Sequence, residues 1–111
     1  MDNKKDTKYF SRKAIENIDA ISNYINGKSY EEFVNDNQLI DAVMFRLIQL
    51  VENIKNISQD FKQANPQIPW GDVMGFRNGI VHEYGKTDYI TVYETITHDL
   101  TDLKAVLKTI I

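Results

Sequence analysis

The chain has 111 residues, a formal net charge of −3 and no cysteine, and 42% of its residues are hydrophobic. This length gives one domain with one modest core, and the composition is ordinary for a globular protein. The lack of cysteine excludes a disulfide framework, a thiolate zinc site and a cysteine nucleophile. The acidic balance argues against bulk electrostatic binding of nucleic acid, so any RNA contact needs a local basic patch.

No apolar run approaches the roughly 18 residues that span a bilayer. Residues 1–5 are polar and charged and are not followed by an apolar region, so we do not predict a secretory signal peptide here. A chain without cysteine also suits a reducing compartment. We therefore expect a soluble, cytoplasmic protein that makes no membrane contact.

The first periodic segment predicts a helix over residues 8–26, with residues 1–7 as a flexible N-terminus. Gly27 is the expected C-terminal stop, because glycine readily ends a helix. The apolar face recurs at intervals of three and four and consists of Phe10, Ala14, Ile18, Ile21 and Ile25.

A short helix is predicted next. Ser29 is followed three residues later by Glu32, which is the spacing of a capping box. We expect this helix to turn Tyr30 and Phe33 towards the core.

The longest periodic segment, residues 36–61, predicts one central helix capped by Asp36 or Asn37. Its apolar positions are Ile40, Val43, Leu47, Leu50, Val51, Ile54, Ile57 and Phe61. The prolines within residues 65–69 cannot continue a helix. Trp70 follows at once and is expected to anchor this loop on the core.

Two more helices are predicted, one over residues 70–84 and a last one capped by Thr87 or Asp88. The first carries glycines at intervals of four (Gly71, Gly75 and Gly79), a bare stripe that lets another backbone or a ligand come close. The apolar face of the last helix is Val92, Ile96, Leu100, Leu103, Leu107 and Ile110. The sequence thus predicts an all-α, up-and-down bundle of four to five helices that forms a single domain over residues 1–111.

The candidate site is the segment that holds Arg77, Asn78, His82 and Tyr84. On a helical wheel Arg77 falls near the middle of the apolar arc and stacks in line with Tyr84. Asn78 and His82, four residues apart, lie together beyond the edge of that arc. An arginine on an apolar face needs a carboxylate, a phosphate or solvent, because its guanidinium does not deprotonate.

Purely structural roles for these residues also remain open. Arg77 can pair internally with Glu52 or Glu94, or it can reach a cleft shared with another subunit. His82 can be a partly exposed histidine bonded to Asn78. The second histidine, His98, lacks ligand spacing and is expected on the surface. Two histidines in different helices, with no cysteine, are too few ligands for a typical metal site, so no metal is predicted.

Arg77-Asn78, the four residues between Arg77 and His82, and Tyr84 reproduce the Arg-x4-His-x-Tyr signature of HepT-like proteins, a branch of the all-α HEPN superfamily. The resemblance extends to the short helix at residues 29–33, to residues 41–43 and Glu52 of the central helix, and to the Pro-x-Ile-Pro-Trp loop. It covers nearly the whole chain from about residue 8. Two positions depart from the family pattern: Val51 stands where a small residue is usual, and Gly79 where a larger one is frequent.

The resemblance implies a metal-independent endoribonuclease with no cofactor, whose site lies at the cleft of a two-fold homodimer. His82 would act as general base or acid, Arg77 would grip the phosphate, and Asn78 would orient either group, with Glu52 in a supporting position. It further implies the toxin of a type VII-like toxin–antitoxin pair, in which an MNT-domain nucleotidyltransferase antitoxin modifies Tyr84 with AMP. RNA is the implied substrate, and DNA is not expected.

The wheel also bears on the dimer. Arg77 and His82 diverge by about 140° on a regular helix, so one helix does not easily aim both at one phosphate. Two copies across a two-fold axis can do so. The alternative function is a non-catalytic helical subunit that presents nucleotide or substrate to a nucleotidyltransferase, which the acidic net charge favours slightly.

Overall fold

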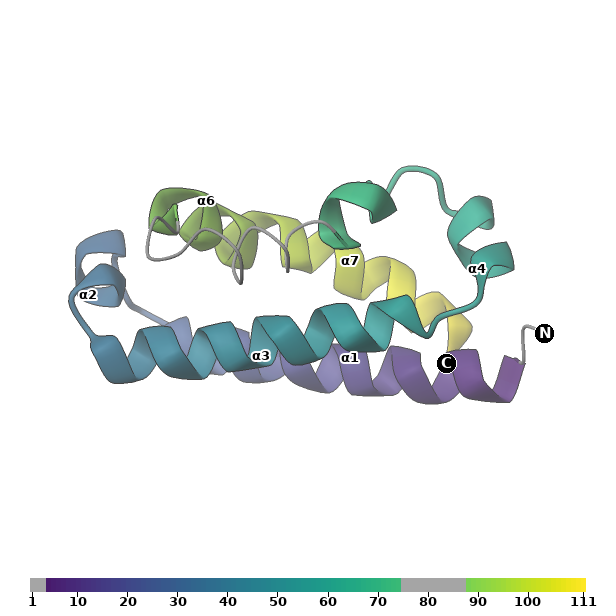
Figure 1. The fold of residues 1–111 in the computed structure, drawn as a ribbon, viewed down its shortest axis with the longest axis horizontal. Coiled ribbons are helices and arrows are strands. Elements are labelled where there is room, and N and C mark those ends of the chain that lie inside the picture. The colour runs from purple at the N-terminus through teal and green to yellow at the C-terminus, as the bar shows by residue number, and fades with distance from the viewer. Residues whose placement is uncertain (1–3, 75–87) are drawn as a thin grey trace.

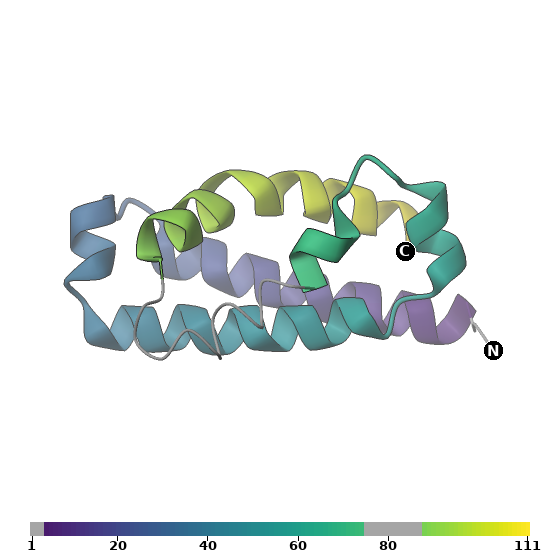
Figure 2. The same cartoon turned by 45° about the horizontal axis from the view of Figure 1, so that its top comes forward.

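The computed structural model describes residues 4–74 and 88–111, which form helices and turns and include no strand. Helices α1 (Lys4–Ile25) and α3 (Asn37–Lys55) lie side by side and antiparallel (Figure 1). A third helical run, residues 89–110, lies over this pair (Figure 2). The predicted all-α fold is confirmed. In the described part of the chain, no helix is both long and apolar enough to cross a membrane.

Helix α1 begins four residues earlier than the sequence predicted, at Lys4. Residues 4–7 are therefore helical, and the predicted start of the helix at residue 8 is wrong. The physical reason is a tertiary contact, because Thr7 is 2% exposed and its hydroxyl accepts a hydrogen bond of 3.0 Å from the backbone N–H of Ser58. The helix ends at Ile25, and Gly27 has the positive φ of 75° that a left-handed helix stop requires.

Helix α2 (Tyr30–Val34) begins with the predicted capping box. The Ser29 hydroxyl accepts from the N–H of Glu32 (3.1 Å), and the Glu32 carboxylate accepts from the N–H of Ser29 (2.9 Å). The backbone N–H of Ser29, followed by its hydroxyl, lowers the pKa of Glu32. Phe33 is completely buried, as predicted, and Tyr30 is partly buried with its ring against that of Tyr93.

The prediction of one continuous central helix over residues 36–61 is correct as far as Lys55 and wrong beyond it. Helix α3 ends at Lys55, and a separate α4 (Gln59–Ala64) follows after a turn. Two short polar side chains cause the break, because such groups compete with the helical backbone for hydrogen bonds. The Asn56 amide donates to the Glu52 carbonyl (2.8 Å), and the Ser58 hydroxyl accepts from the N–H of Phe61 (3.1 Å) as the cap of α4.

The last helical run comprises α6 (Tyr89–Glu94), the π-helical turn η1 (Thr95–Asp99), α7 (Leu100–Leu107) and the 3-10 turn η2 (Lys108–Ile110). Asp88 caps it, as one of the two predicted residues. The predicted apolar face is buried except for Ile110, which is partly exposed. The π-turn was not predicted. At this turn the Thr97 hydroxyl donates to the carbonyl of Tyr93 (2.7 Å), one helical turn earlier.

One core joins these elements. Its largest fully buried side chains come from α1, α2, α3 and α7 and are Phe33, Ile18, Ile21, Leu47, Leu50, Ile54 and Leu107. The core therefore fixes the elements on either side of residues 75–87.

Candidate functional site

The segment that leads into the candidate site is pinned to the core. Trp70 donates from its indole N–H to the carbonyl of Asn65 (3.0 Å), and its ring packs edge-on against Phe61 with centroids 6.3 Å apart. The Asn65 side-chain amide donates to the carbonyl of Phe61 (2.9 Å). The predicted anchoring role of Trp70 is confirmed. A helical turn begins at Trp70 and is described as far as Met74.

The segment that leaves the candidate site is fixed as well. Asp88 accepts from both the N–H (3.1 Å) and the hydroxyl (2.7 Å) of Thr91. The hydroxyl, followed by the N–H, lowers the pKa of the Asp88 carboxyl, so it is ionised at neutral pH and caps α6. One turn on, Tyr93 packs against Phe33 with ring centroids 5.7 Å apart and donates its hydroxyl to the carbonyl of Lys28 (2.6 Å).

The predicted catalytic and modified residues, Arg77, Asn78, His82 and Tyr84, lie outside the described residues, as do Gly75 and Gly79. Of the predicted set, only the supporting residue is placed. Glu52 is exposed on α3, and Glu94, the other carboxylate proposed as an internal partner of Arg77, is exposed on α6. His98 is exposed on η1, as predicted.

Gly71, the first glycine of the predicted stripe, faces open space. Among the described residues, a Cβ atom built at this position would meet no heavy atom within 4 Å. Close packing within this subunit therefore does not require glycine at position 71. An approach by another molecule remains its predicted use.

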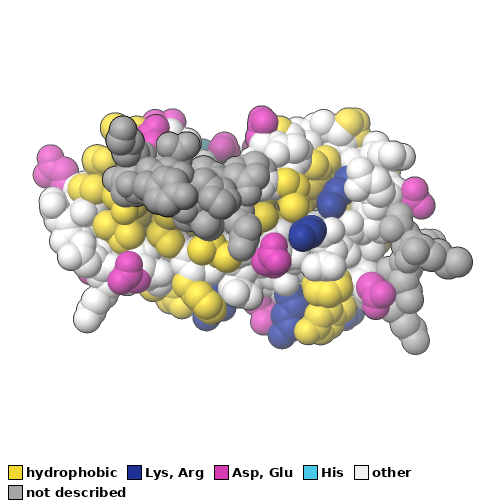
Figure 3. All heavy atoms as spheres, viewed as in Figure 1, with side chains coloured by type: hydrophobic (Ala, Val, Ile, Leu, Met, Phe, Trp, Pro, Cys, Tyr) yellow, Lys and Arg dark blue, Asp and Glu magenta, His cyan; other side chains and the backbone are white. Residues whose placement is uncertain are grey.

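A cavity of about 720 Å³ lies beside the entry segment. Its apolar floor comes from α3 and α7 and includes Leu50 and Leu103. Figure 3 shows hydrophobic side chains at the surface on the side of the molecule that Figure 1 faces. Three carboxylates also line it: Asp72, Asp99 and Asp102. Phosphate groups would be repelled by these three carboxylates, the charged groups among the described residues that line the cavity.

A cation that sequence reasoning missed lies between α1 and α3. Arg46 donates to the Tyr24 hydroxyl and to the Asn17 amide oxygen, both at 3.2 Å. The signal was present, because Arg46 lies between the buried positions Val43 and Leu50 of the central helix. The criterion that singled out Arg77, a cation among periodic apolar residues, applies equally here.

Comparison with known proteins gives one consistent result. Residues 14–110 match the family model described as Ribonuclease HepT-like. Two proteins of Methanocaldococcus jannaschii, each named as a candidate RNase, are 33% and 32% identical over 108 residues, covering 97% of this chain and 89% and 93% of their own lengths. A protein of Thermococcus cleftensis named as a probable ribonuclease HepT is 30% identical over 101 residues, covering 91% of this chain and 92% of its own. No solved structure matches this chain.

Proposed function

Since this chain belongs to the HepT-like ribonuclease family, we propose that it is a metal-independent endoribonuclease and the toxin of a toxin–antitoxin pair. The observation that carries the proposal is the set Arg77, Asn78, His82 and Tyr84 at the family spacing, inside the matched residues 14–110. The anchors at Trp70 and Asp88 support it, because they hold both ends of the segment that carries this set.

The proposed reaction is a transesterification within the RNA strand. The ribose 2′-oxygen loses its proton to a base and bonds to the adjacent phosphorus, while the bond from phosphorus to the 5′-oxygen breaks. The departing 5′-oxygen takes a proton from an acid, which leaves a 2′,3′-cyclic phosphate and a 5′-hydroxyl. His82 titrates in the right range for either transfer, since an ordinary histidine pKa is about 6.5. Arg77 stabilises the charge that develops on the phosphate.

The proposed site is shared by two copies of the chain. Arg77 and His82 point about 140° apart on a regular helix, and a two-fold axis brings the Arg77 of one copy towards the His82 of the other. The open space at Gly71 supports this arrangement, because that face of the entry segment is free for a close approach.

We expect the purified protein to cleave single-stranded RNA in the presence of excess EDTA. The products should carry 2′,3′-cyclic phosphate and 5′-hydroxyl ends, and an RNA of the same sequence that is 2′-O-methylated throughout should stay intact. End-group analysis by mass spectrometry and gel electrophoresis measures both. A requirement for Mg²⁺, or cleavage of the methylated RNA, would contradict the mechanism. No cleavage of either RNA would favour the alternative of a non-catalytic subunit of a nucleotidyltransferase complex.

We further propose that the antitoxin silences this protein at Tyr84. The phenol oxygen bonds to the α-phosphorus of ATP, pyrophosphate leaves, and the phenolic proton passes to a base of the nucleotidyltransferase. The added AMP places a bulky anion in line with Arg77, where it neutralises the cation and fills the cleft.

Incubation with the neighbouring nucleotidyltransferase and ATP is expected to add one AMP to Tyr84 and to suppress RNA cleavage. Peptide mass spectrometry locates the modification. Tyr84→Phe is the matched control, since it keeps the ring but lacks the acceptor oxygen, and its RNA cleavage should persist in the same mixture. Silencing of Tyr84→Phe to the same degree would show that the antitoxin acts by another route.

A further inference from the structure

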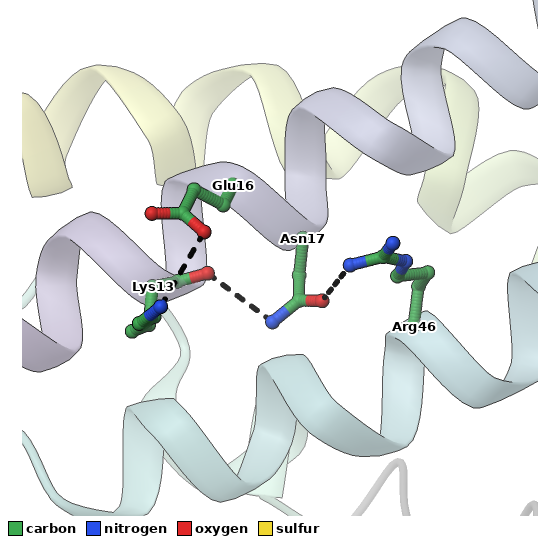
Figure 4. A network of polar contacts seen from close by, with 4 residues as sticks. All are labelled: Lys13, Glu16, Asn17 and Arg46. Atoms are coloured by element: carbon green, nitrogen blue, oxygen red, sulfur yellow. Dashed lines mark hydrogen bonds and ion pairs between the residues drawn. The ribbon is translucent and has the colours of Figure 1, made fainter.

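Arg46 lies in the seam between α1 and α3, where Figure 4 shows its guanidinium directed towards the side-chain oxygen of Asn17. The Nε–H donates to the hydroxyl of Tyr24, and an Nη1–H donates to the side-chain oxygen of Asn17, each at 3.2 Å. The guanidinium also lies over the Tyr24 ring, 6.0 Å from its centroid. These contacts orient the cation without neutralising it.

No carboxylate in the described part of the chain pairs with Arg46. The ion pairs there join Lys13 to Glu16 (3.7 Å) and Lys104 to Asp19 (2.6 Å). Arg46 is only partly exposed, and an arginine cannot lose its charge to escape the cost of burial. This placement points to an anion supplied by another molecule.

The neutrality of Asn17 is the second observation. Asn17 is 7% exposed, and its amide N–H₂ donates to the backbone carbonyl of Lys13 (3.2 Å), which turns its oxygen towards Arg46. An aspartate of almost the same shape would neutralise Arg46 within the subunit. With asparagine the positive charge stays available, and the two hydrogen bonds leave three of the five guanidinium N–H donors for a ligand.

The first half of α1 is rich in cations by sequence, and Lys13, the last of them, pairs with Glu16 (3.7 Å). Residues 4–13 contain five of the 13 Lys and Arg residues of the chain and a single acid, Asp6. Lys13 lies one turn before Asn17, and its ammonium sits 5.7 Å from the ring centroid of Tyr9, which is 50% exposed. An exposed aromatic ring beside cations is the arrangement that single-stranded nucleic acid uses, with bases stacked on the ring and phosphates on the charges.

We propose that the α1–α3 seam is a binding site for the backbone of single-stranded RNA, with Arg46 on a phosphate, Lys13 beside it and Tyr9 under a base. The site rests on the proposed ribonuclease function and lies outside residues 75–87. A phosphate fits because the planar guanidinium binds it through two parallel hydrogen bonds. Among the described residues that line the cavity on α3 and α7, the charged ones are Asp72, Asp99 and Asp102, so the seam fits a phosphate better.

The test is the affinity for a fluorescent, fully 2′-O-methylated RNA oligonucleotide, measured by anisotropy over a range of salt concentrations. This RNA has no attacking 2′-hydroxyl, so binding is read separately from cleavage. Arg46→Gln is expected to weaken binding about tenfold at low salt and to reduce the slope of log affinity against log salt by about 0.7, the value of one phosphate contact on a single strand. Arg46→Lys should lie between wild type and Arg46→Gln, because it keeps the charge and loses the planar fork.

Asn17→Asp is the second variant, and it leaves Arg46 in place. The new carboxylate should pair with Arg46 and weaken RNA binding in the same direction. Lys28→Gln is the matched control, since it removes one exposed cation from the turn between α1 and α2, and its affinity should stay within about twofold of wild type. Circular dichroism melts of each variant check that the fold persists.

Three outcomes would overturn the inference. The first is unchanged affinity in Arg46→Gln and Asn17→Asp, and the second is equal loss in Lys28→Gln. The third is a shift of Arg46→Gln from dimer to monomer in light scattering with normal RNA affinity, because the anion would then be a carboxylate of a second copy. Wild type that binds the methylated RNA but leaves ordinary RNA intact would sink the proposed nuclease and keep this site. If wild type cleaves RNA and Arg46→Gln binds RNA normally, the proposed nuclease stands and the proposed site at Arg46 fails.

Discussion

Replacing His82 with alanine is expected to slow RNA cleavage by about 10²- to 10⁴-fold, the usual contribution of a positioned acid or base. The 2′-oxygen must lose a proton and the 5′-oxygen must gain one, and alanine can do neither. The wild-type rate should also change with pH around the ordinary histidine pKa of about 6.5, and this inflection should vanish in the variant. Initial rates on a fluorogenic RNA, measured between pH 5 and 8, give both results.

His98→Ala is the matched control, because the chain has two histidines and His98 is exposed on η1 away from any predicted role. It should cleave RNA at the wild-type rate with the same pH profile. A fall in activity in His98→Ala as large as in His82→Ala would show that the assay reports folding or expression. Wild-type activity in His82→Ala would remove the general acid–base role and leave Arg77 as the remaining catalytic candidate.

The fold could be predicted from apolar spacing because each helix of the bundle buries one stripe. Ile18 and Ile21 of α1, Leu47 and Leu50 of α3, and Leu103 of α7 all fall on the predicted faces and are at most 3% exposed. The helix N-caps could be predicted as well, because each depends on residues only three positions apart. Ser29 bonds to Glu32 three residues away, and Asp88 bonds to Thr91 at the same spacing. Signals within one turn of the chain were sufficient for these features.

The break after α3 could not be predicted from the same pattern. Ile57 and Phe61 continue the apolar spacing of α3, so periodicity gives no sign that the helix ends at Lys55. The turn is stabilised by a hydrogen bond from Ser58 to Thr7, 51 residues away in the sequence. The same bond accounts for the early start of α1. Both errors therefore involve one tertiary contact that no local window of sequence contains, and at the break it acts together with the local hydrogen bonds of Asn56 and Ser58.

The candidate functional residues also differ in whether local sequence or a tertiary contact reveals their role. Arg77, Asn78, His82 and Tyr84 could be recognised from sequence because their chemistry lies within eight residues. Arg46 carries the same sequence signal, a cation among periodic apolar residues, but its role depends on Asn17, 29 residues earlier, and on the orientation of that amide. A lone arginine in an apolar pattern signals that an anion is needed. Only the structure identifies the neutral partners that leave this requirement unmet within the described residues.

Phe33→Ala is expected to lower the free energy of unfolding by about 3–5 kcal/mol, the usual cost of emptying a buried phenylalanine site. Phe33 is completely buried, and its ring packs against Tyr93 (centroids 5.7 Å apart) and Tyr89 (6.4 Å). Helix α2 has only five residues, and Phe33 is the one that is buried, so it is the main apolar contact of α2 with α6, beside the partly buried Tyr30. Such a loss is a large part of the roughly 5–15 kcal/mol that stabilises a domain. Urea unfolding at one fixed protein concentration measures it.

Phe45→Ala is the matched control, since it removes the same side chain from α3 at a position that is 57% exposed. Its free energy of unfolding should change by no more than about 0.5 kcal/mol. A loss below about 1 kcal/mol in Phe33→Ala would mean that α2 contributes little to the folded state. A loss in Phe45→Ala as large as in Phe33→Ala, and dependent on protein concentration, would instead place this exposed face of α3 in a contact between two copies.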